Sequence, residues 1–306
     1  MPAVIKVQNL RKTYGDIVAV ADVSFEVGEG EIFGILGPNG AGKTTTVECI
    51  EGLRKPDGGE ISVLGLDPQH HRAELTQRLG VQLQDSLLPD RLKVREALQL
   101  YSAFYRAPAD WHELMDVLGL TEKADAQFKK LSGGQKQRLS IALALLGSPQ
   151  IAMLDELTTG LDPQARRDTW GLIESVRDRG VTIVLVTHFM EEAERLCDRV
   201  AMIDSGRVVA LDTPAALAER VEGEQRIQFR PSAPFADELL TSLPDVSSVT
   251  RRGDLVVVTG SSNALGAVAT ALASNKIVPE QLRVEQSNLE DAFLKLTGKH
   301  THDEES

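Results

Sequence analysis

The feature that most restricts the fold of this chain is a glycine-rich run between an apolar strand and a helix. Residues 31–36 predict the strand, and a helix is expected over residues 46–51, ending at Gly52. Glycines in such a run let consecutive backbone N–H groups curl around an anion at the start of the helix. The strand–loop–helix order therefore predicts an α/β fold with a phosphate-binding loop. The loop consists of Gly37, Pro38, Asn39, Gly40, Ala41, Gly42, Lys43 and Thr44.

The polar residues of this loop predict nucleotide binding. Lys43 would place a cation on the β- and γ-phosphate oxygens, and the Thr44 hydroxyl would ligate Mg²⁺. We expect Thr45 to donate to the α-phosphate. A short pattern can match by chance, but a match with the correct strand and helix on its flanks is rarely false.

A second glycine-rich element lies some ninety residues later, at residues 131–135. Ser132 and Gln135 fit a capping box, with Ser at the N-cap and Gln at N3. Gly133 and Gly134 leave the backbone N–H groups of this helix start open to a phosphate. A bare S-G-G triplet would favour an ordinary helix start, but the other motifs of this chain favour a functional one.

Two further strands end in polar residues. The apolar run 151–155 ends at Asp155, which is expected to hold Mg²⁺ through water, and Glu156 follows as the general base that polarises the attacking water. The alternative is a solvated Asp–Glu pair at a strand end, which the phosphate loop makes the weaker reading. The strand predicted over residues 181–187 ends at His188. A single histidine is usually structural, but this position favours contact with the γ-phosphate.

Charge and composition exclude several classes of protein. The net charge is −12 and the basic residues form no block, which argues against nucleic acid as the main partner. The longest apolar runs are too short to span a bilayer, and the first twelve residues have no signal-peptide pattern. Cys49 and Cys197 have no metal-ligand spacing and are expected to be buried, reduced thiols of a cytosolic protein.

Over about residues 4–215, these motifs and their order resemble the ATP-binding cassette (ABC) family of transport ATPases. The resemblance implies a P-loop NTPase fold with a RecA-like core, an antiparallel β subdomain and a helical subdomain over about residues 85–148. It implies that Tyr14 stacks on adenine and that Gln84 contacts Mg²⁺ and senses a membrane subunit. Gln82 is a rival for the role of Gln84 because strand alternation puts both on one face, although Gln84 lies nearer the strand end.

The resemblance also implies a composite site. In the family, two cassettes enclose two ATP molecules, and the signature helix beginning at Ser132 caps the γ-phosphate held by the phosphate loop of the other subunit. Asp162 matches the loop aspartate that couples the two sites, and His188 matches the switch histidine. Leu157 stands where the family usually has proline; we expect no loss of hydrolysis from this difference, which a change in turnover beyond a few-fold in Leu157→Pro would contradict.

After residue 221 the pattern changes to the order β-α-β-β-α-β, which predicts a small ferredoxin-like domain over residues 222–298, with a disordered tail at 299–306. The helices are expected over 234–243 and 264–275, and a final amphipathic helix carries Leu289, Phe293 and Leu296. That helix could simply cap the core of the small domain. The domain and the ending resemble exporters typified by daunorubicin/doxorubicin-resistance ATPases, and we expect the domain to regulate or support dimerisation.

The prediction is therefore an ATP-hydrolysing subunit that works as a homodimer on the cytoplasmic face of the membrane. It would drive export of a drug, antibiotic or lipid-like cargo through a separately encoded ABC-2 type permease. One alternative is a cassette ATPase of DNA repair or translation, but those usually carry a long coiled coil or two cassettes in one chain. Another is a regulatory module that binds nucleotide without turnover, against which Glu156 and His188 argue.

Overall fold

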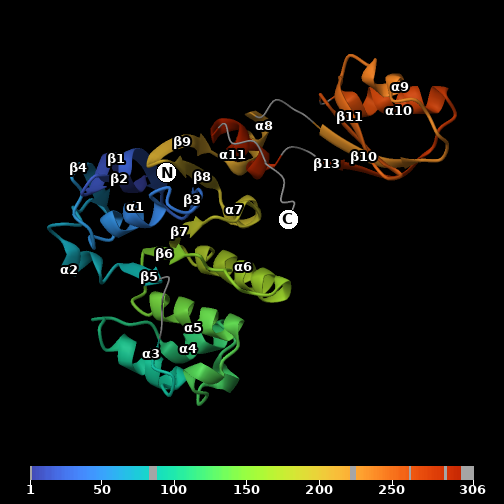
Figure 1. Cartoon of the computed structure of the whole chain (residues 1–306). Helices are drawn as coiled ribbons and strands as arrows, with labels where there is room; N and C mark the ends of the chain where they lie inside the picture. Colours follow the sequence, from blue (N-terminus) through green and yellow to red (C-terminus); the bar gives the residue numbers. More distant parts are fainter. Residues whose placement is uncertain (1, 83–87, 221–224, 262, 286–287, 298–306) are drawn as a thin grey trace. The chain divides into compact units, whose positions relative to one another are not determined.

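The computed structural model describes residues 2–82, 88–220, 225–261, 263–285 and 288–297. The contacts divide the chain into two compact units, Met1–Pro214 and Ala215–Ser306, each of which is described by itself. Figure 1 shows the elements of both units coloured along the sequence.

The first unit is built on a nine-stranded sheet in the order β4-β1-β2-β9-β8-β3-β7-β6-β5. The strands β8, β3, β7, β6 and β5 run parallel and form the core sheet, and β1, β2 and β4 form an antiparallel part. The strand bounds are β1 Ala3–Tyr14, β2 Ile17–Gly28, β3 Ile32–Leu36, β4 Gly58–Val63, β5 Leu79–Gln82, β6 Ile151–Asp155, β7 Thr182–Thr187, β8 Arg199–Asp204 and β9 Arg207–Asp212.

The parallel strands are short, apolar and buried on both faces. All five residues of β3 and all six of β7 are buried, as expected for strands covered by helices on both sides of a sheet. By contrast, β2 alternates, with Val23, Phe25 and Val27 buried and the residues between them partly or fully exposed. The strands predicted before the phosphate loop, before Glu156 and before His188 are all present.

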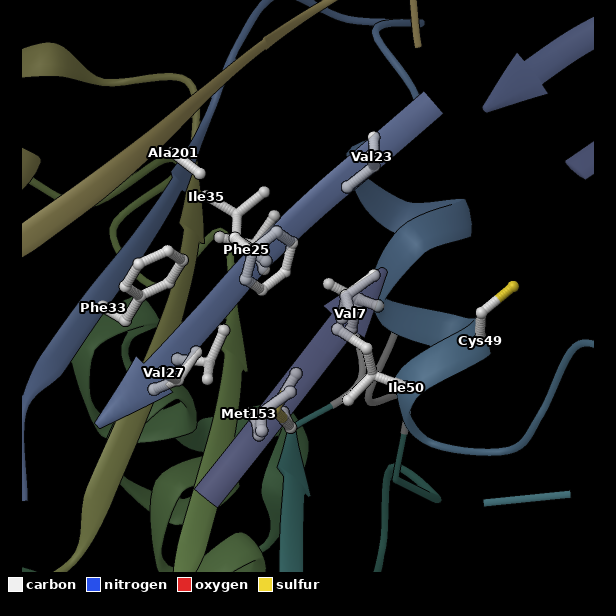
Figure 2. Close-up of a cluster of buried hydrophobic side chains, with 14 of the residues drawn as sticks. Val7, Val23, Phe25, Val27, Phe33, Ile35, Cys49, Ile50, Met153 and Ala201 are labelled. Atoms are coloured by element: carbon white, nitrogen blue, oxygen red, sulfur yellow. The ribbon is translucent and has the colours of Figure 1, made fainter. Parts of the chain in front are cut away.

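One part of the core lies where the antiparallel strands face the core sheet and helix α1 (Lys43–Ile50). Phe25 of β2 stacks on Phe33 of β3 with ring centroids 5.2 Å apart. Figure 2 shows these rings together with Val7, Ile50 and Met153. This packing holds α1, and therefore the loop before it, against the sheet.

The helical subdomain, at the lower end of the first unit in Figure 1, contains α3 (Val94–Ser102), α4 (Trp111–Val117) and α5 (Gly133–Leu145). The amphipathic pattern of residues 118–126 predicts a further short helix, and this prediction is wrong: only a 3₁₀ turn forms there, at Thr121–Lys123. The carbonyl groups of Ala124 and Ala126 instead accept from Arg95 and Val94, at the N-terminus of α3. This segment satisfies the free donors of another helix and does not continue as a helix itself.

Of the remaining helices of the first unit, the first leads from β4 to β5, and the other two connect strands of the core sheet. They are α2 (Arg72–Leu75), α6 (Pro163–Arg177) and α7 (Met190–Leu196). Both cysteines are free and buried, and burial raises the pKa of the Cys49 thiol to about 11. This agrees with the prediction of buried thiols outside a disulfide.

The second unit contains a four-stranded antiparallel sheet in the order β11-β12-β10-β13. The element order is β-α-β-β-α-β, as predicted, and side chains of both helices join the core beside Phe229 and Val258. The elements are β10 Gln225–Pro231, α9 Glu238–Thr241, β11 Val246–Arg252, β12 Leu255–Gly260, α10 Ala264–Ser274 and β13 Pro279–Glu285.

The first of these two helices is much shorter than predicted. Phe235 stacks on Phe229 at 6.3 Å, and Asp237 accepts from Arg251 at 2.7 Å. The segment before Asp237 is therefore tied to the neighbouring strands, and the helix itself spans only Glu238–Thr241, with Asp237 as its N-cap.

In the chain, helix α8 (Pro214–Arg220) precedes the strands of this sheet and helix α11 (Leu289–Thr297) follows them. By its contacts α8 is grouped with the second unit, whereas the predicted boundary at residue 221 places it in the first. Leu289 and Phe293 of α11 are buried, as the amphipathic pattern predicts. The residues expected to form the linker (222–224) and the tail (299–306) lie outside the described residues.

Candidate nucleotide-binding site

The phosphate loop curls in front of α1 as its sequence predicts. Gly42 is the N-cap of α1 with φ 100°, and a Cβ there would meet the carbonyl oxygen of Ala19 at 2.3 Å. Only glycine fits this position, in both backbone conformation and space. The Lys43 ammonium donates to the carbonyl oxygens of Gly37 at 2.8 Å and Pro38 at 3.0 Å, which holds the cation over the loop.

Two carboxylates follow the end of β6, beside this cation. Burial raises the pKa of Asp155 to about 6, and the negative charge of Glu156 adds to the shift. Burial lowers the pKa of Lys43, an effect that Glu156 and Asp155 oppose. The structure therefore brings Lys43, Asp155 and Glu156 within electrostatic reach of one another, although more than a hundred residues of sequence separate the lysine from the acids.

Glu156 and His188 meet at the carboxyl ends of β6 and β7. His188 Nδ1 lies 3.3 Å from Glu156 Oε1, close enough for an ion pair when the imidazole is protonated, although the angle is not that of a hydrogen bond. Glu156 has φ 46°, a left-handed conformation that is rare for a glutamate, and its N–H donates to Val186 at 2.9 Å. Strain of this kind is often found at functional positions. Leu157, the residue after it, is fully buried.

A hollow of about 160 Å³ opens beside Thr44 and Asp155. Gln82, the last residue of β5, lines it and is only 6% exposed, and its Oε1 has no hydrogen-bond partner among the described residues. Glu51 also lines the hollow; burial, followed by the charges of Asp155 and Glu48, raises its pKa to about 8. Gln84 lies outside the described residues, so the choice between the two glutamines stays a prediction.

The aromatic residue Tyr14 is the last residue of β1 and is 41% exposed, as a stacking platform must be. Asp57 fixes the two residues before it. Its carboxylate accepts from Lys12 Nζ at 2.9 Å, from the Thr13 N–H at 2.7 Å and from the Thr13 hydroxyl at 2.9 Å. These bonds hold the pKa of Asp57 at about 2. The Lys12 ammonium also lies 5.4 Å from the centre of the Tyr14 ring.

The signature segment forms the predicted capping box. The Ser132 hydroxyl accepts from the N–H of Gln135 at 3.3 Å, and the Gln135 side chain accepts from the N–H of Ser132 at 3.0 Å. Asp162 caps α6 in a similar way, accepting from the N–H groups of Gln164 and Ala165 at 3.0 and 2.9 Å.

These two helix starts share one hollow. It has a volume of about 350 Å³ and is lined by Ser132, Gly133, Gly134, Gln135 and Asp162 among others. The hollow beside Thr44 and Asp155 has no lining residue in common with it. Within one chain, therefore, Thr44, Gln82 and Asp155, with Lys43 beside them, form a first group, and Ser132, Gly133, Gly134, Gln135 and Asp162 form a second.

ATP and Mg²⁺ fit the first group. Gly42 leaves the backbone bare where the loop turns, and Lys43 supplies a held cation. The buried Gln82 Oε1 has no hydrogen-bond partner within the part of the chain that the structure describes. Hydroxyl, carboxylate and amide oxygens, as on Thr44, Asp155 and Gln82, are the ligand types that Mg²⁺ prefers. No cluster of three or more His, Cys, Asp or Glu residues that could hold another metal is found among the described residues.

The core sheet, the phosphate loop, the carboxylates after β6 and the capped signature helix together define a P-loop ATPase of the cassette type. The family model described as ABC transporter matches residues 20–159. The chain is 40% identical to the Nod factor export ATP-binding protein I of Burkholderia orbicola, over 98% of this chain and 99% of that protein. It belongs to the ATP-binding subunits of ABC transporters, and it is an ATPase that binds ATP with Mg²⁺.

Other similarities agree with this assignment. The Nod factor export ATP-binding protein I of Rhizobium etli is 38% identical over 96% of this chain and 93% of that protein. A solved structure of the ATP-binding subunit of an ABC transporter is 29% identical, covers 71% of this chain and 92% of that chain, and superposes with a TM-score of 0.64.

A dimeric bacterial ABC transporter cassette is also similar in structure, with 29% identity, coverage of 68% of this chain and 98% of that chain, and a TM-score of 0.58. A related dimeric structure contains ADP and phosphate. Among the described residues, no helix combines the length and apolar character needed to cross a bilayer.

The sequence reasoning missed three acidic residues near the site: Glu51, Asp57 and Glu192. The signal for Glu51 was weak, a glutamate just before the glycine that ends α1. Asp57 follows a proline and precedes two glycines, so it looked like an ordinary turn residue. Glu192 lies in the first turn of α7, where an acidic residue is usually read as a solvated partner of the helix dipole.

Proposed function

We propose that two copies of this chain enclose two ATP molecules, with the phosphate loop of one copy facing the signature helix of the other. The observation that carries this proposal is the separation of the site residues into two hollows within one chain. The first hollow has Thr44, which directly follows Lys43, and Asp155, which directly precedes Glu156, and the second has Ser132 and Asp162. The similarity to dimeric cassettes supports the union of the two groups across a dimer.

In this proposal the residues of one copy bind the nucleotide, orient its phosphates and deprotonate the attacking water. Backbone N–H groups of the loop and Lys43 hold the phosphates, and Thr44 and Asp155 would hold Mg²⁺ together with Gln84 or Gln82. Bound Mg²⁺ neutralises charge on the phosphates and orients them. Glu156 takes the proton of the attacking water, and His188 beside it holds the γ-phosphate. Tyr14 stacks on adenine, and Thr45 donates to the α-phosphate.

The partner copy completes the cage around the γ-phosphate. The N–H groups of Gly133 and Gly134 lie at the start of a helix whose dipole favours an anion. Asp162 lies in the same hollow, where it can couple the two sites. Binding of ATP joins the copies and hydrolysis lets them part, because only the nucleotide-bound state has contacts to both halves.

The test of this assignment is Glu156→Gln in the full chain. We expect hydrolysis to fall by more than about 100-fold while ATP affinity is kept, because the amide cannot accept the proton of water. Size-exclusion chromatography with ATP should then show a stable dimer that dissociates on removal of the nucleotide. Unchanged hydrolysis in this variant would overturn the role of Glu156.

We further propose that the chain drives export through a separate permease and lies on the cytoplasmic face of the membrane, held there by that permease. The relatives named for Nod factor export support export as the direction. A permease of the ABC-2 type and a drug, antibiotic or lipid-like cargo, as in the daunorubicin/doxorubicin subgroup, are the finer parts of the proposal. Co-purification with the membrane protein encoded next to this chain is the direct test, and a neighbouring gene with no membrane spans would count against it.

The second unit is proposed to support or regulate dimerisation of the cassettes. Its own core and sheet make it a separate folding unit, and it is not needed to complete the P-loop fold. Deletion after Glu222 should weaken ATP-dependent dimerisation or change the ATPase rate. If dimerisation, hydrolysis and transport all stay as in the full chain, this role is wrong.

A further inference from the structure

Glu192 is a glutamate with no exposed surface, in the first turn of α7. A carboxyl group at such a place is rare without partners, because burial removes its hydration. Burial raises the pKa of Glu192, and hydrogen bonds from nearby hydroxyl and indole groups lower it by a smaller amount. None of the roles assigned above uses this residue, so its surroundings must explain why it is there.

Its partners come from three different segments. The indole N–H of Trp170, on α6, donates to Glu192 Oε1 at 3.4 Å. Two hydroxyls also lower the pKa of this carboxyl: that of Thr187, at the end of β7, and that of Thr158, in the turn after β6. Both threonines are fully buried. Figure 1 shows α6 and α7 beside the ends of β6 and β7, and the two helices are in contact.

Each of these segments holds one residue of the proposed catalytic machinery. Thr187 directly precedes His188, and its hydroxyl accepts from the N–H of Phe189 at 3.0 Å. Thr158 follows Glu156 by two residues in the turn. Trp170 lies on the helix that begins at its N-cap Asp162. The Glu192 carboxyl is therefore a common contact of the segments that position the base, the switch histidine and the coupling aspartate.

One part of this contact is incomplete. Glu192 Oε2 and the Thr158 hydroxyl oxygen are both buried, and neither has a partner at hydrogen-bond geometry among the described residues. Buried polar atoms are nearly always paired, so an unpaired acceptor next to an unpaired hydroxyl calls for an explanation. A small movement of the turn that holds Thr158 would pair them and would carry Glu156 with it.

We infer that Glu192 is a positioning residue that fixes the turn of Glu156 relative to His188 and α6, acting through Thr158, Thr187 and Trp170. The inference rests on the proposed roles of Glu156 and His188. It predicts an effect on the hydrolytic step and none on nucleotide binding, because the groups that act on Glu192 are Trp170, Thr187, Thr158 and Arg166, and none of them belongs to the phosphate loop. If Glu192 only stabilised α7, its substitution would instead lower stability and nucleotide affinity together.

The experiment compares Glu192→Ala and Glu192→Gln with the matched control Glu191→Gln in the full chain. Glu191 is the neighbouring residue of the same helix, its side chain is 72% exposed, and its contact with Arg166 is a surface pair at 3.5 Å. For each variant we would measure kcat, KM and the affinity for a fluorescent ATP analogue, with the thermal midpoint as a check on folding.

For Glu192→Ala we expect kcat to fall at least ten-fold with KM and nucleotide affinity within two-fold of the parent. Glu192→Gln should recover most of the rate, because its amide can still accept from Trp170 and can donate to Thr158. Glu191→Gln should behave as the parent. A parental kcat in Glu192→Ala, or a parallel loss of kcat, affinity and thermal midpoint, would overturn the inference.

Thr158→Val keeps the test decisive if Glu192→Ala does not fold, since it removes only the hydroxyl through which the Glu192 carboxyl would act on the turn of Glu156. A reduced kcat with unchanged affinity supports the inference, and a parental kcat refutes it. Glu156→Gln in the same series separates the two levels of the argument. If that variant still hydrolyses ATP, the proposed function fails; if it is inactive while Glu192→Ala is normal, only the role of Glu192 fails.

Discussion

Single residues of the site are defined by their surroundings more than by their type. The carboxyls of Asp155, half-buried, and Glu51, buried, line the same hollow, yet only Asp155 stands at the end of a strand. Glu51 follows α1 and is 8% exposed, with a pKa of about 8 caused by burial and the charges of Asp155 and Glu48. Near neutral pH this glutamate is mostly uncharged, which places a neutral acid beside the proposed Mg²⁺ ligands.

The raised pKa of Glu51 predicts how stability depends on pH. Glu51 binds a proton more tightly in the folded chain than in the unfolded chain, where the ordinary value of 4.5 applies. Its contribution to the free energy of unfolding therefore falls as pH rises from about 4.5 to about 8, and the loss is complete above that range. In Glu51→Gln this loss is absent, so at pH 9 the variant should exceed the parent by on the order of 4 kcal/mol.

Urea unfolding of both proteins at pH 5 and pH 9, without nucleotide and with a chelator, measures this difference. The exposed Glu60 provides the control. The difference in the free energy of unfolding between Glu60→Gln and the parent should be the same at both pH values. A stability difference between Glu51→Gln and the parent that does not grow with pH would show that Glu51 is charged in the folded chain.

At the scale of elements, the ends of strands and helices carry the chemistry. The capping box of α5 follows directly from the sequence, because it needs only a serine and a glutamine three residues apart. The helix ends that were predicted wrongly, in the segments 118–126 and 234–243, are those where distant residues take over the backbone or side-chain partners. Local propensity has no information about such partners.

The end of β1 provides a prediction at this scale. Asp57, just before β4, accepts three hydrogen bonds from Lys12 and Thr13. These bonds hold the end of β1 in place, and Tyr14 with it, in the position proposed for stacking on adenine. Asp57→Ala should weaken ATP binding about five-fold or more, which is about 1 kcal/mol. Binding of inorganic tripolyphosphate, which has no base, should stay the same. Isothermal titration with both ligands measures the two affinities.

Tyr14→Ala is the comparison that makes this test informative. If Tyr14→Ala weakens ATP binding and Asp57→Ala does not, Tyr14 stacks without help from Asp57. Loss of tripolyphosphate binding in Asp57→Ala would show that the substitution disturbs the phosphate loop as well. That result would contradict a role for Asp57 that is limited to Lys12, Thr13 and Tyr14.

For the whole molecule, the division of the site into two hollows predicts complementation between inactive copies. Lys43→Ala should abolish ATP binding and hydrolysis, and Ser132→Arg should block the signature helix. In a mixed dimer, the intact phosphate loop of the Ser132→Arg copy faces the intact signature helix of the Lys43→Ala copy. We therefore expect a mixture of the two variants to regain ATPase activity that neither has alone, up to about one quarter of the parental rate for random pairing of independent sites.

The measurement is the ATPase rate as a function of mixing ratio and of total protein concentration. The parental rate per chain should rise with concentration, because a monomer has half of each site. If the mixture stays inactive at all ratios while both variants fold and pair, the two hollows do not act together across a dimer.

The sequence by itself determined the fold class, the phosphate loop, the carboxylates after β6, the histidine after β7 and the capped signature helix. Each of these depends on residue types at fixed local spacing, and the backbone geometry that they need is set by neighbours in the chain. The β-α-β-β-α-β order of the second unit was predictable for the same reason, from alternation and turn residues.

Only the tertiary structure decided which distant residues surround these motifs. The pKa of Glu51 depends on burial beside Asp155, the hold on Tyr14 depends on Asp57, and the burial of Glu192 depends on Trp170 and two threonines. Desolvation and hydrogen bonding act over a few ångströms in space, between residues that lie tens to a hundred positions apart in the chain. For this reason the sequence predicted the reaction, whereas the groups that position and tune its residues became visible only in the folded chain.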